Sequence, residues 1–125
     1  MYPNNLKYTE QHEWIDPESG KIGITNYAQE QLGDIVFVEL PDEGKELALD
    51  DVFGVIESVK SVSDCFSPVN GVVKSVNESL TDDPSLLNTS PYDEGWIIQI
   101  DFSDASEIEK LMSGDDYKKY LEEVS

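Results

Sequence analysis

The sequence has little of what most catalytic sites require. Its 125 residues include one histidine, His12, and one cysteine, Cys65. A single cysteine excludes an internal disulfide and fits a reducing compartment. The sequence alone leaves a Cys–His nucleophilic pair open. We favour the structural roles, because Cys65 lies in a strand-like run, where a free cysteine usually acts as a small hydrophobic side chain. We expect His12 to be a partly buried, hydrogen-bonded residue at the edge of the core.

Recognisable ligand patterns for metals and phosphate are also missing. The chain has no C-x-x-C or H-x-x-x-H spacing, no calcium-loop pattern among its acidic residues and no Gly-rich phosphate loop. Its longest apolar run, Ile35 to Val38, has the length of a strand, so we expect no transmembrane helix. The first seven residues have neither the apolar region of a secretion signal nor the Arg-rich pattern of an organelle presequence. We therefore expect a cytoplasmic protein, or a mitochondrial matrix protein if the chain is a processed eukaryotic one.

Positive charge is scarce. The chain has eight Lys and Arg residues and 27 Asp and Glu residues, which gives a formal net charge of -19 at pH 7. Such a surface repels phosphate backbones, so we expect neither nucleic acid nor membrane among the partners. The excess of acid fits simple solubility, and it equally fits steering toward basic patches on partner enzymes. Composition leaves these two interpretations open.

The apolar pattern predicts a single domain over residues 1–125 that is mainly β. Short runs rich in β-branched residues alternate with turns marked by Pro and Gly, which is typical of a β-sandwich or a flattened barrel. The run from Ile35 to Leu40 predicts a largely buried strand. In the run from Gly95 to Phe102, alternation predicts that Trp96, Ile98, Ile100 and Phe102 face one way and Ile97, Gln99 and Asp101 the other.

Capping signals predict short helices around the strands. Thr25 or Asn26 can begin a helix that runs to Leu32, and Gly33 can end it. One helical turn is expected at 83–87, with Pro84 in its first position. A C-terminal helical segment is expected over about 104–124. Its first helix would be capped by Asp104 with Glu107 and ended by Gly114, and its second would dock on the sheets through a stripe formed by Tyr117, Tyr120, Leu121 and Val124.

One lysine stands where a hairpin should reverse. Lys60 lies between a β-rich approach from Val52 to Val59 and a β-rich return from Val62 to Phe66. A lysine in such a turn is usually only solvated. The other interpretation is that the tip presents a primary amine on a flexible stem for covalent attachment of an acyl arm.

The residues around Lys60 carry a family resemblance. The run from Gly54 to Asp64, G-V-I-E-S-V-K-S-V-S-D, and the following S-P-V-N-G resemble the lipoyl-attachment hairpin of glycine cleavage system H proteins. Further matches in family order cover almost the whole chain: His12-Glu13-Trp14, the run from Gly23 to Asp34, the run from Val36 to Pro41, and Asn88-x-x-Pro91-Tyr92-x-x-Gly95-Trp96.

Two other carrier families fit less well. Biotin carriers typically flank their attachment lysine with methionines, whereas here the neighbours are Val59 and Ser61. Lipoyl domains of 2-oxoacid dehydrogenase complexes typically place an acid directly before the lysine. Here the acid, Glu57, comes three residues before it, as in H proteins. An alternative of a different class is an unmodified acidic scaffold that only binds partners.

The resemblance implies a fold and an activity. The fold would be a hybrid barrel-sandwich of two antiparallel sheets with short peripheral helices and a C-terminal helix. The protein would be a non-catalytic, monomeric carrier with (R)-lipoate on Lys60. It would take an aminomethyl group from the pyridoxal-phosphate enzyme glycine decarboxylase to a tetrahydrofolate-dependent aminomethyltransferase, and dihydrolipoyl dehydrogenase, with FAD and NAD, would reoxidise it. A lipoate ligase or octanoyltransferase would load it. The alternative within the family is an octanoyl or lipoyl relay in lipoate biosynthesis or transfer.

The resemblance also implies roles for four residues besides Lys60. Glu57 and Gly71 would help the modifying enzyme to recognise the hairpin. Glu13 and Asp64 would hold the amine of the loaded arm, because an ammonium group enters an apolar cleft only with a partner of opposite charge.

Overall fold

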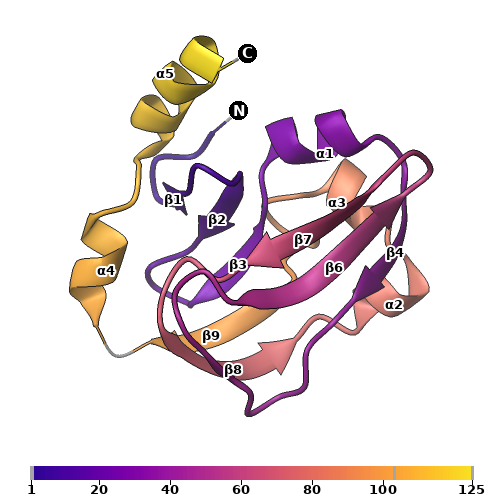
Figure 1. Ribbon diagram of the computed structural model, residues 1–125, viewed down its shortest axis with the longest axis horizontal. Coiled ribbons are helices and arrows are strands. Elements are labelled where there is room, and N and C mark those ends of the chain that lie inside the picture. The colour runs from indigo at the N-terminus through magenta and orange to yellow at the C-terminus, as the bar shows by residue number, and fades with distance from the viewer. Residues whose placement is uncertain (1, 103, 125) are drawn as a thin grey trace.

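The protein folds as two antiparallel sheets with helices at their margins, as a computed structural model shows (Figure 1). The structure describes residues 2–102 and 104–124. A six-stranded sheet has the order β1-β2-β3-β9-β8-β5, and a three-stranded sheet has the order β4-β6-β7. No strand pairing among the described residues closes either sheet into a barrel. The larger sheet comprises β1 (Lys7–Tyr8), β2 (Glu13–Ile15), β3 (Lys21–Ile24), β5 (Glu46–Leu47), β8 (Gly71–Val76) and β9 (Ile98–Phe102), and the smaller comprises β4 (Ile35–Glu39), β6 (Val52–Ser58) and β7 (Val62–Phe66).

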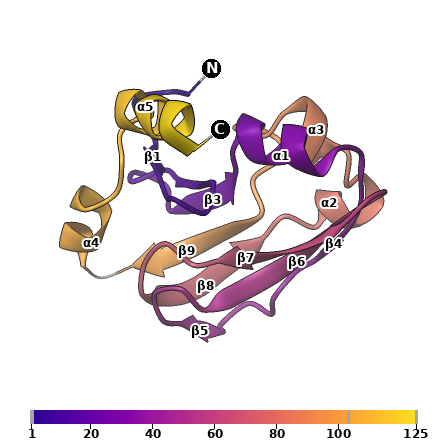
Figure 2. The same ribbon diagram turned by 45° about the horizontal axis from the view of Figure 1, so that its top comes forward.

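The apolar faces of the two sheets form the main core. Ile22, Ile98 and Val73 from the larger sheet and Ile56 from the smaller one are at most 1% exposed. Figure 2 shows β6 and β7 lying over β8 and β9, so the three-stranded sheet has one face on the core and one face outward. The two-sheet architecture expected from the sequence is confirmed.

The helices lie at the margins of the sheets. Helix α1 spans Asn26–Leu32, with Thr25 as its N-cap and Gly33 as its C-cap, as expected. The others are α2 (Ser79–Asp82), α3 (Leu86–Thr89), α4 (Ala105–Glu109) and α5 (Gly114–Val124). No helix among the described residues is long and apolar enough to cross a membrane.

A second cluster of buried residues joins the C-terminal helix to the N-terminal strands. Tyr117 of α5 stacks on Tyr8 of β1 with ring centroids 4.9 Å apart, and both side chains are fully buried. Main-chain hydrogen bonds between Tyr8 and Met112 join β1 to the segment that precedes α5. The expected docking of this helix through Tyr117 and Leu121 is confirmed, but Val124 is 52% exposed and lies outside the contact.

Several expectations about individual elements are wrong. The strand from Ile35 is not largely buried, since Val36 and Phe37 are 54% and 49% exposed. The reason is that this sheet has only one face on the core, and that a register shift in the pairing with β6 between Ile35 and Phe37 leaves two successive residues of β4 exposed. The expected alternation holds over β9, where Ile98 and Ile100 are buried and Gln99 and Asp101 are not, while Ile97, which is 1% exposed, lies before the strand begins. Gly114 begins α5 and does not end α4, and any Cβ there would collide with the main-chain oxygen of Tyr2.

Two short helices also differ from the expectation. The turn expected at 83–87 starts later, at Leu86, and Pro84 precedes it. The sequence pattern did not reveal α2, which begins shortly after β8 and buries Leu80. Its single turn is too short to show an apolar periodicity.

Candidate functional site

Lys60 lies at the tip of the β6–β7 hairpin, where its side chain is exposed. The side chain of Ser58 accepts hydrogen bonds from the main-chain N–H groups of Lys60 and Ser61, at 3.3 and 3.1 Å. The Ser58 N–H donates to the Ser61 carbonyl at 2.8 Å and closes the turn. These bonds use main chain and one serine hydroxyl. The amine of Lys60 therefore makes none of the contacts that hold the tip.

The tip also contacts the segment that connects α1 to β4. The Val59 N–H donates to the Asp34 carbonyl at 3.0 Å (Figure 1 shows the tip beside the end of α1). The Lys60 stem lies over Gly33, where an added Cβ would be 3.3 Å from the lysine Cε. Gly33 has φ +78°, which disfavours any residue with a Cβ. The sequence indicated Gly33 only as a helix end, and its contact with Lys60 was missed because nothing in the local pattern links the two.

A small cavity next to the hairpin brings together residues from five elements. Its volume is about 150 Å³. Both residues expected to hold an amine, Glu13 of β2 and Asp64 of β7, line it. The other lining residues come from the β1–β2 connection, from β3, from α1 and from the hairpin: Gln11, His12, Ile24, Tyr27, Ala28, Gln31, Leu32, Ile56, Ser63 and Cys65. The cavity is thus walled mainly by apolar groups and carries two carboxyl groups.

Glu13 is the buried carboxyl group of this cavity. Its side chain is only 2% exposed. One oxygen accepts the Thr9 hydroxyl at 3.0 Å, and the other accepts the main-chain N–H of Phe66 at 3.0 Å. Burial raises the pKa of Glu13 to about 7, although these two hydrogen bonds act in the opposite direction. Near neutral pH, Glu13 can therefore hold or release a proton, and a cation in the cavity would favour its charged form.

Asp64 differs from Glu13 in its setting. It is exposed and lies on the edge strand β7, opposite Val55 of β6. An exposed carboxylate can turn toward the cavity or toward solvent. The pair therefore offers one buried and one exposed carboxyl group.

The two residues that the sequence left open as a catalytic pair both line this cavity. His12 is half-buried, and its Nδ1 lies 2.8 Å from the Tyr117 hydroxyl. Cys65 is 2% exposed, and burial raises the pKa of its thiol. Because a thiolate is the nucleophilic form, this setting does not activate Cys65. The expected structural roles of both residues are confirmed.

Of the two residues expected to guide recognition, Glu57 lies in the hairpin near its tip and Gly71 lies outside the hairpin. Glu57 pairs with Val62 in the last row before the tip. Gly71 opens β8, five residues after the hairpin ends at Phe66. A Cβ on Gly71 would meet the Asp101 carbonyl oxygen at 2.7 Å, so the glycine is required by the close approach of β9. Any influence of Gly71 on the tip is therefore indirect.

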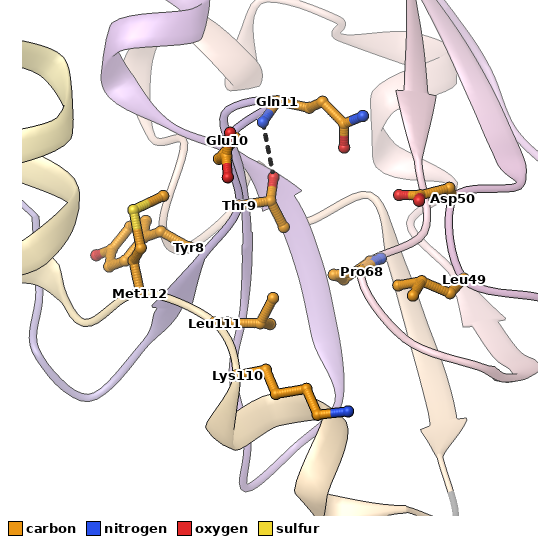
Figure 3. A pocket seen from close by; sticks show the side chains of 10 residues that line it. All are labelled: Tyr8, Thr9, Glu10, Gln11, Leu49, Asp50, Pro68, Lys110, Leu111 and Met112. Atoms are coloured by element: carbon orange, nitrogen blue, oxygen red, sulfur yellow. Dashed lines mark hydrogen bonds between the residues drawn. The ribbon is translucent and has the colours of Figure 1, made fainter. Parts of the chain in front are cut away.

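A larger cavity lies elsewhere. It has a volume of about 310 Å³ between the β1–β2 connection, the β5–β6 connection and the segment that joins α4 to α5 (Figure 3). Thr9 lines it and accepts the Gln11 N–H there at 3.3 Å. Neither Lys60 nor the two carboxyl groups of the small cavity line this larger one, so its size does not make it the candidate site.

Comparisons with known proteins agree with this geometry. The family model for the glycine cleavage H-protein matches residues 6–124. A glycine cleavage system H protein of Halalkalibacterium halodurans is 54% identical, with 97% of this chain and 96% of that protein covered. One of Bacillus subtilis is 50% identical, with 97% of each chain covered. The crystal structure of a glycine cleavage system H protein from Mycobacterium marinum matches with a TM-score of 0.88 and 34% identity, and covers 96% of this chain and 98% of that one.

The hairpin with its exposed lysine, the two-sheet fold and these full-length matches lead to one assignment: the chain belongs to the glycine cleavage system H-protein family, a family of lipoyl carriers.

Proposed function

We propose that Lys60 carries a lipoyl group in amide linkage and that the protein shuttles the aminomethyl group of glycine between enzymes. The observation that carries the proposal is the position of Lys60, exposed at a hairpin tip whose turn is closed without its amine. An acyl group on Nζ would therefore break none of the hydrogen bonds that hold the tip. The 150 Å³ cavity beside the hairpin adds a place for the loaded end of the arm.

The attachment step needs only the lysine from this chain. A lipoate ligase would supply the lipoyl carboxyl group as an acyl-adenylate. Nζ of Lys60 attacks the carbonyl carbon, the new C–N bond replaces the C–O bond to AMP, and the amine loses a proton. In the shuttle, the attached group would supply a disulfide that accepts the aminomethyl carbon and two electrons.

The partner enzymes would carry out the chemistry on that group. A pyridoxal-phosphate glycine decarboxylase would load it with release of carbon dioxide. A tetrahydrofolate-dependent aminomethyltransferase would unload it with release of ammonia, and a flavin-dependent dihydrolipoyl dehydrogenase would pass two electrons and a proton to NAD. Residues 1–125 would form one monomeric, non-catalytic carrier domain. The free, buried Cys65 and the bacterial relatives support a cytoplasmic location.

Within the proposal, the chain's own carboxyl groups have distinct tasks. Glu13 and Asp64 line the cavity and would pair with the ammonium of the loaded arm. That pairing offsets the cost of taking a charge out of water. The enzyme that modifies Lys60 would bind Glu57, since Glu57 belongs to the last residue pair of β6 and β7 before the tip.

Intact mass spectrometry tests the proposal. Incubation with a lipoate ligase, ATP and lipoic acid should add one lipoyl group to the wild type and none to Lys60→Arg. Loaded wild type should then support glycine decarboxylation with the purified partner enzymes. Modification of the Lys60→Arg variant at another lysine would contradict the assignment. Loading without glycine decarboxylation, but with transfer of the lipoyl group to another carrier, would favour a relay function.

A further inference from the structure

The outward face of the three-stranded sheet has an ordered row of side chains beneath the hairpin tip. Strand pairing places Phe37 of β4 opposite Glu57 of β6, and Glu57 opposite Val62 of β7. Directly opposite residues of antiparallel strands point to the same face. The three side chains therefore form one line across the sheet, apolar–acidic–apolar, which we call the Phe37 row.

The next outward-facing row along the strands has the reverse order. Glu39 lies opposite Val55, and Val55 opposite Asp64, so this row is acidic–apolar–acidic. The two rows together make a checkerboard in which each apolar side chain is flanked by carboxylates. A partner surface that matches this pattern in one register would place apolar groups on carboxylates if it were shifted by one strand.

The apolar side chains of the Phe37 row are exposed to water, which is unfavourable for apolar surface. Phe37 is 49% exposed and Val62 is 65% exposed, while Val38 and Ile56 in the adjacent inward-facing row are 5% and 1% exposed. Val59, at the tip itself, is 69% exposed. In Figure 1 this sheet lies in front of β8 and β9, and none of the labelled elements covers it from the viewer's side. Exposed apolar groups that cluster in this way typically mark an interaction surface.

We propose that the Phe37 row is the docking surface for the enzyme that acylates Lys60, an inference that rests on the proposed function. The row lies directly below the lysine, because Glu57 comes three residues before it and Val62 two residues after it. The acylating enzyme must bring an acyl carbonyl carbon to Nζ itself, so its active-site rim must cover the residues on either side of Lys60. The later enzymes act on the far end of the attached group and can dock elsewhere.

The row specifies the chemistry of the partner surface. It requires a cationic side chain opposite Glu57, with an apolar recess on each side for Phe37 and Val62. Apolar neighbours exclude water from the ion pair and so strengthen it. The sequence alone did not associate Phe37 with the attachment lysine. It precedes Lys60 by more than twenty residues in the sequence, and only the strand pairing brings it to the lysine's row.

The experiment measures loading of Lys60 by a purified lipoate ligase with ATP and lipoic acid, followed by intact mass. The variants are Phe37→Thr and Val62→Thr, because threonine is a β-branched residue that suits a strand. The matched control is Val52→Thr, at the other end of β6, where the side chain is 39% exposed. We expect kcat/KM to fall about three- to tenfold for Val62→Thr and about tenfold or more for Phe37→Thr. The control should stay within about twofold of wild type.

Folding and later steps are measured on the same proteins. Urea midpoints of the three variants should agree, so that a loading defect is not a folding defect. Once loaded, Phe37→Thr should be reduced and reoxidised by dihydrolipoyl dehydrogenase at the wild-type rate. Equal loading of Phe37→Thr and wild type would overturn the docking surface. If Phe37→Thr were loaded normally but reacted slowly with dihydrolipoyl dehydrogenase, the docking surface would be overturned as well. If the wild type itself took up no lipoyl group at Lys60, the proposed function would fail, and that outcome is distinct from both.

Discussion

The Tyr117 hydroxyl on the C-terminal helix lies 2.8 Å from Nδ1 of His12, across 105 residues of sequence. The same hydroxyl lies 2.8 Å from Oγ1 of Thr25, which is fully buried and already accepts the Ala28 N–H. The Thr25 O–H must therefore donate to Tyr117, or its proton would be buried without a partner. Tyr117 in turn donates to Nδ1, which leaves the proton of neutral His12 on Nε2. Helix α5 thus sets the tautomer of a histidine that lines the small cavity.

Removal of this hydroxyl should be visible at the histidine. We expect Tyr117→Phe to lower the free energy of unfolding by about 1–3 kcal/mol, because the buried Thr25 hydroxyl and the half-buried His12 ring each lose a partner. Nitrogen-15 NMR of the His12 ring should change from the Nε2–H tautomer to a mixture. Tyr120→Phe is the control, since its hydroxyl donates a long, exposed hydrogen bond to the Glu10 carbonyl at 3.4 Å. A Tyr117→Phe protein with an unchanged tautomer signature would contradict the proposed chain of donors.

Glu13 should make the folded protein less stable as pH rises from 4.5 to about 7. Burial raises the pKa of Glu13 to about 7 from an ordinary value of 4.5, so between these two pH values the folded state binds more protons than the unfolded state. The contribution of Glu13 to stability is therefore fully present below pH 4.5 and is lost as pH rises to about 7, by an amount of order 3 kcal/mol. Urea unfolding of wild type and Glu13→Gln from pH 5 to pH 8 measures the difference. The variant should gain stability relative to wild type as pH rises, and a constant difference would contradict the raised pKa.

The two carboxyl groups of the cavity should protect the loaded arm. We expect Glu13→Gln and Asp64→Asn to load lipoate at the wild-type rate but to shorten the lifetime of the aminomethyl-loaded form, because its ammonium loses a partner in the cavity. Formaldehyde release from purified loaded protein reports that lifetime. Asp101→Asn is a control carboxylate on β9, outside the cavity lining. Unchanged release from the double variant would remove both residues from this role.

Gly33 should affect both stability and the attachment lysine. Its φ of +78° and ψ of -155° lie in a region that is essentially restricted to glycine, so we expect Gly33→Ala to cost about 1–3 kcal/mol of stability. The new Cβ would also lie 3.3 Å from Cε of Lys60, and the stem would have to move. Gly44→Ala is a matched control, since Gly44 has φ +88° but nothing lies within 4 Å of a Cβ there. Both variants should lose stability in urea, but only Gly33→Ala should change the loading rate of Lys60. Identical loading rates would show that the contact has no influence on the lysine.

Local signals in the sequence predicted most of the elements correctly. Thr25 and Gly33 bound the first helix because a cap hydroxyl and a residue free to adopt positive φ act within a few residues of the helix ends. The signal for the hairpin around Lys60 was equally local, since β-branched runs on both sides of a short turn suffice to predict it. Gly114 shows the limit of such signals. A glycine after a helix usually ends it, but this one is required by the approach of the N-terminal main chain.

The candidate site depended more on contacts between distant segments. The sequence placed Glu13 and Asp64 in one cleft only through the family resemblance, and the structure shows both lining one cavity. The deep burial of Glu13 was not predicted. Its side chain reaches the main chain of β7, where it accepts the N–H of Phe66, 53 residues away in the sequence. The exposure of Phe37 was missed for a related reason, because a run of apolar residues reveals neither that one face of its sheet is uncovered nor where a register shift interrupts the alternation.

The hydrogen bonds that close the hairpin also determine how far an attached arm can search. The Ser58 bonds and the bond from Val59 to the Asp34 carbonyl hold the main chain on both sides of Lys60. The lysine Cα is therefore a fixed point, and the rotatable bonds of the side chain and of the attached group alone set the volume that the far end explores. A short tether from a fixed point gives a high effective concentration at any active site within reach and almost none beyond it. Each partner enzyme must consequently dock in a narrow range of orientations, with its active site within one arm's length of this tip.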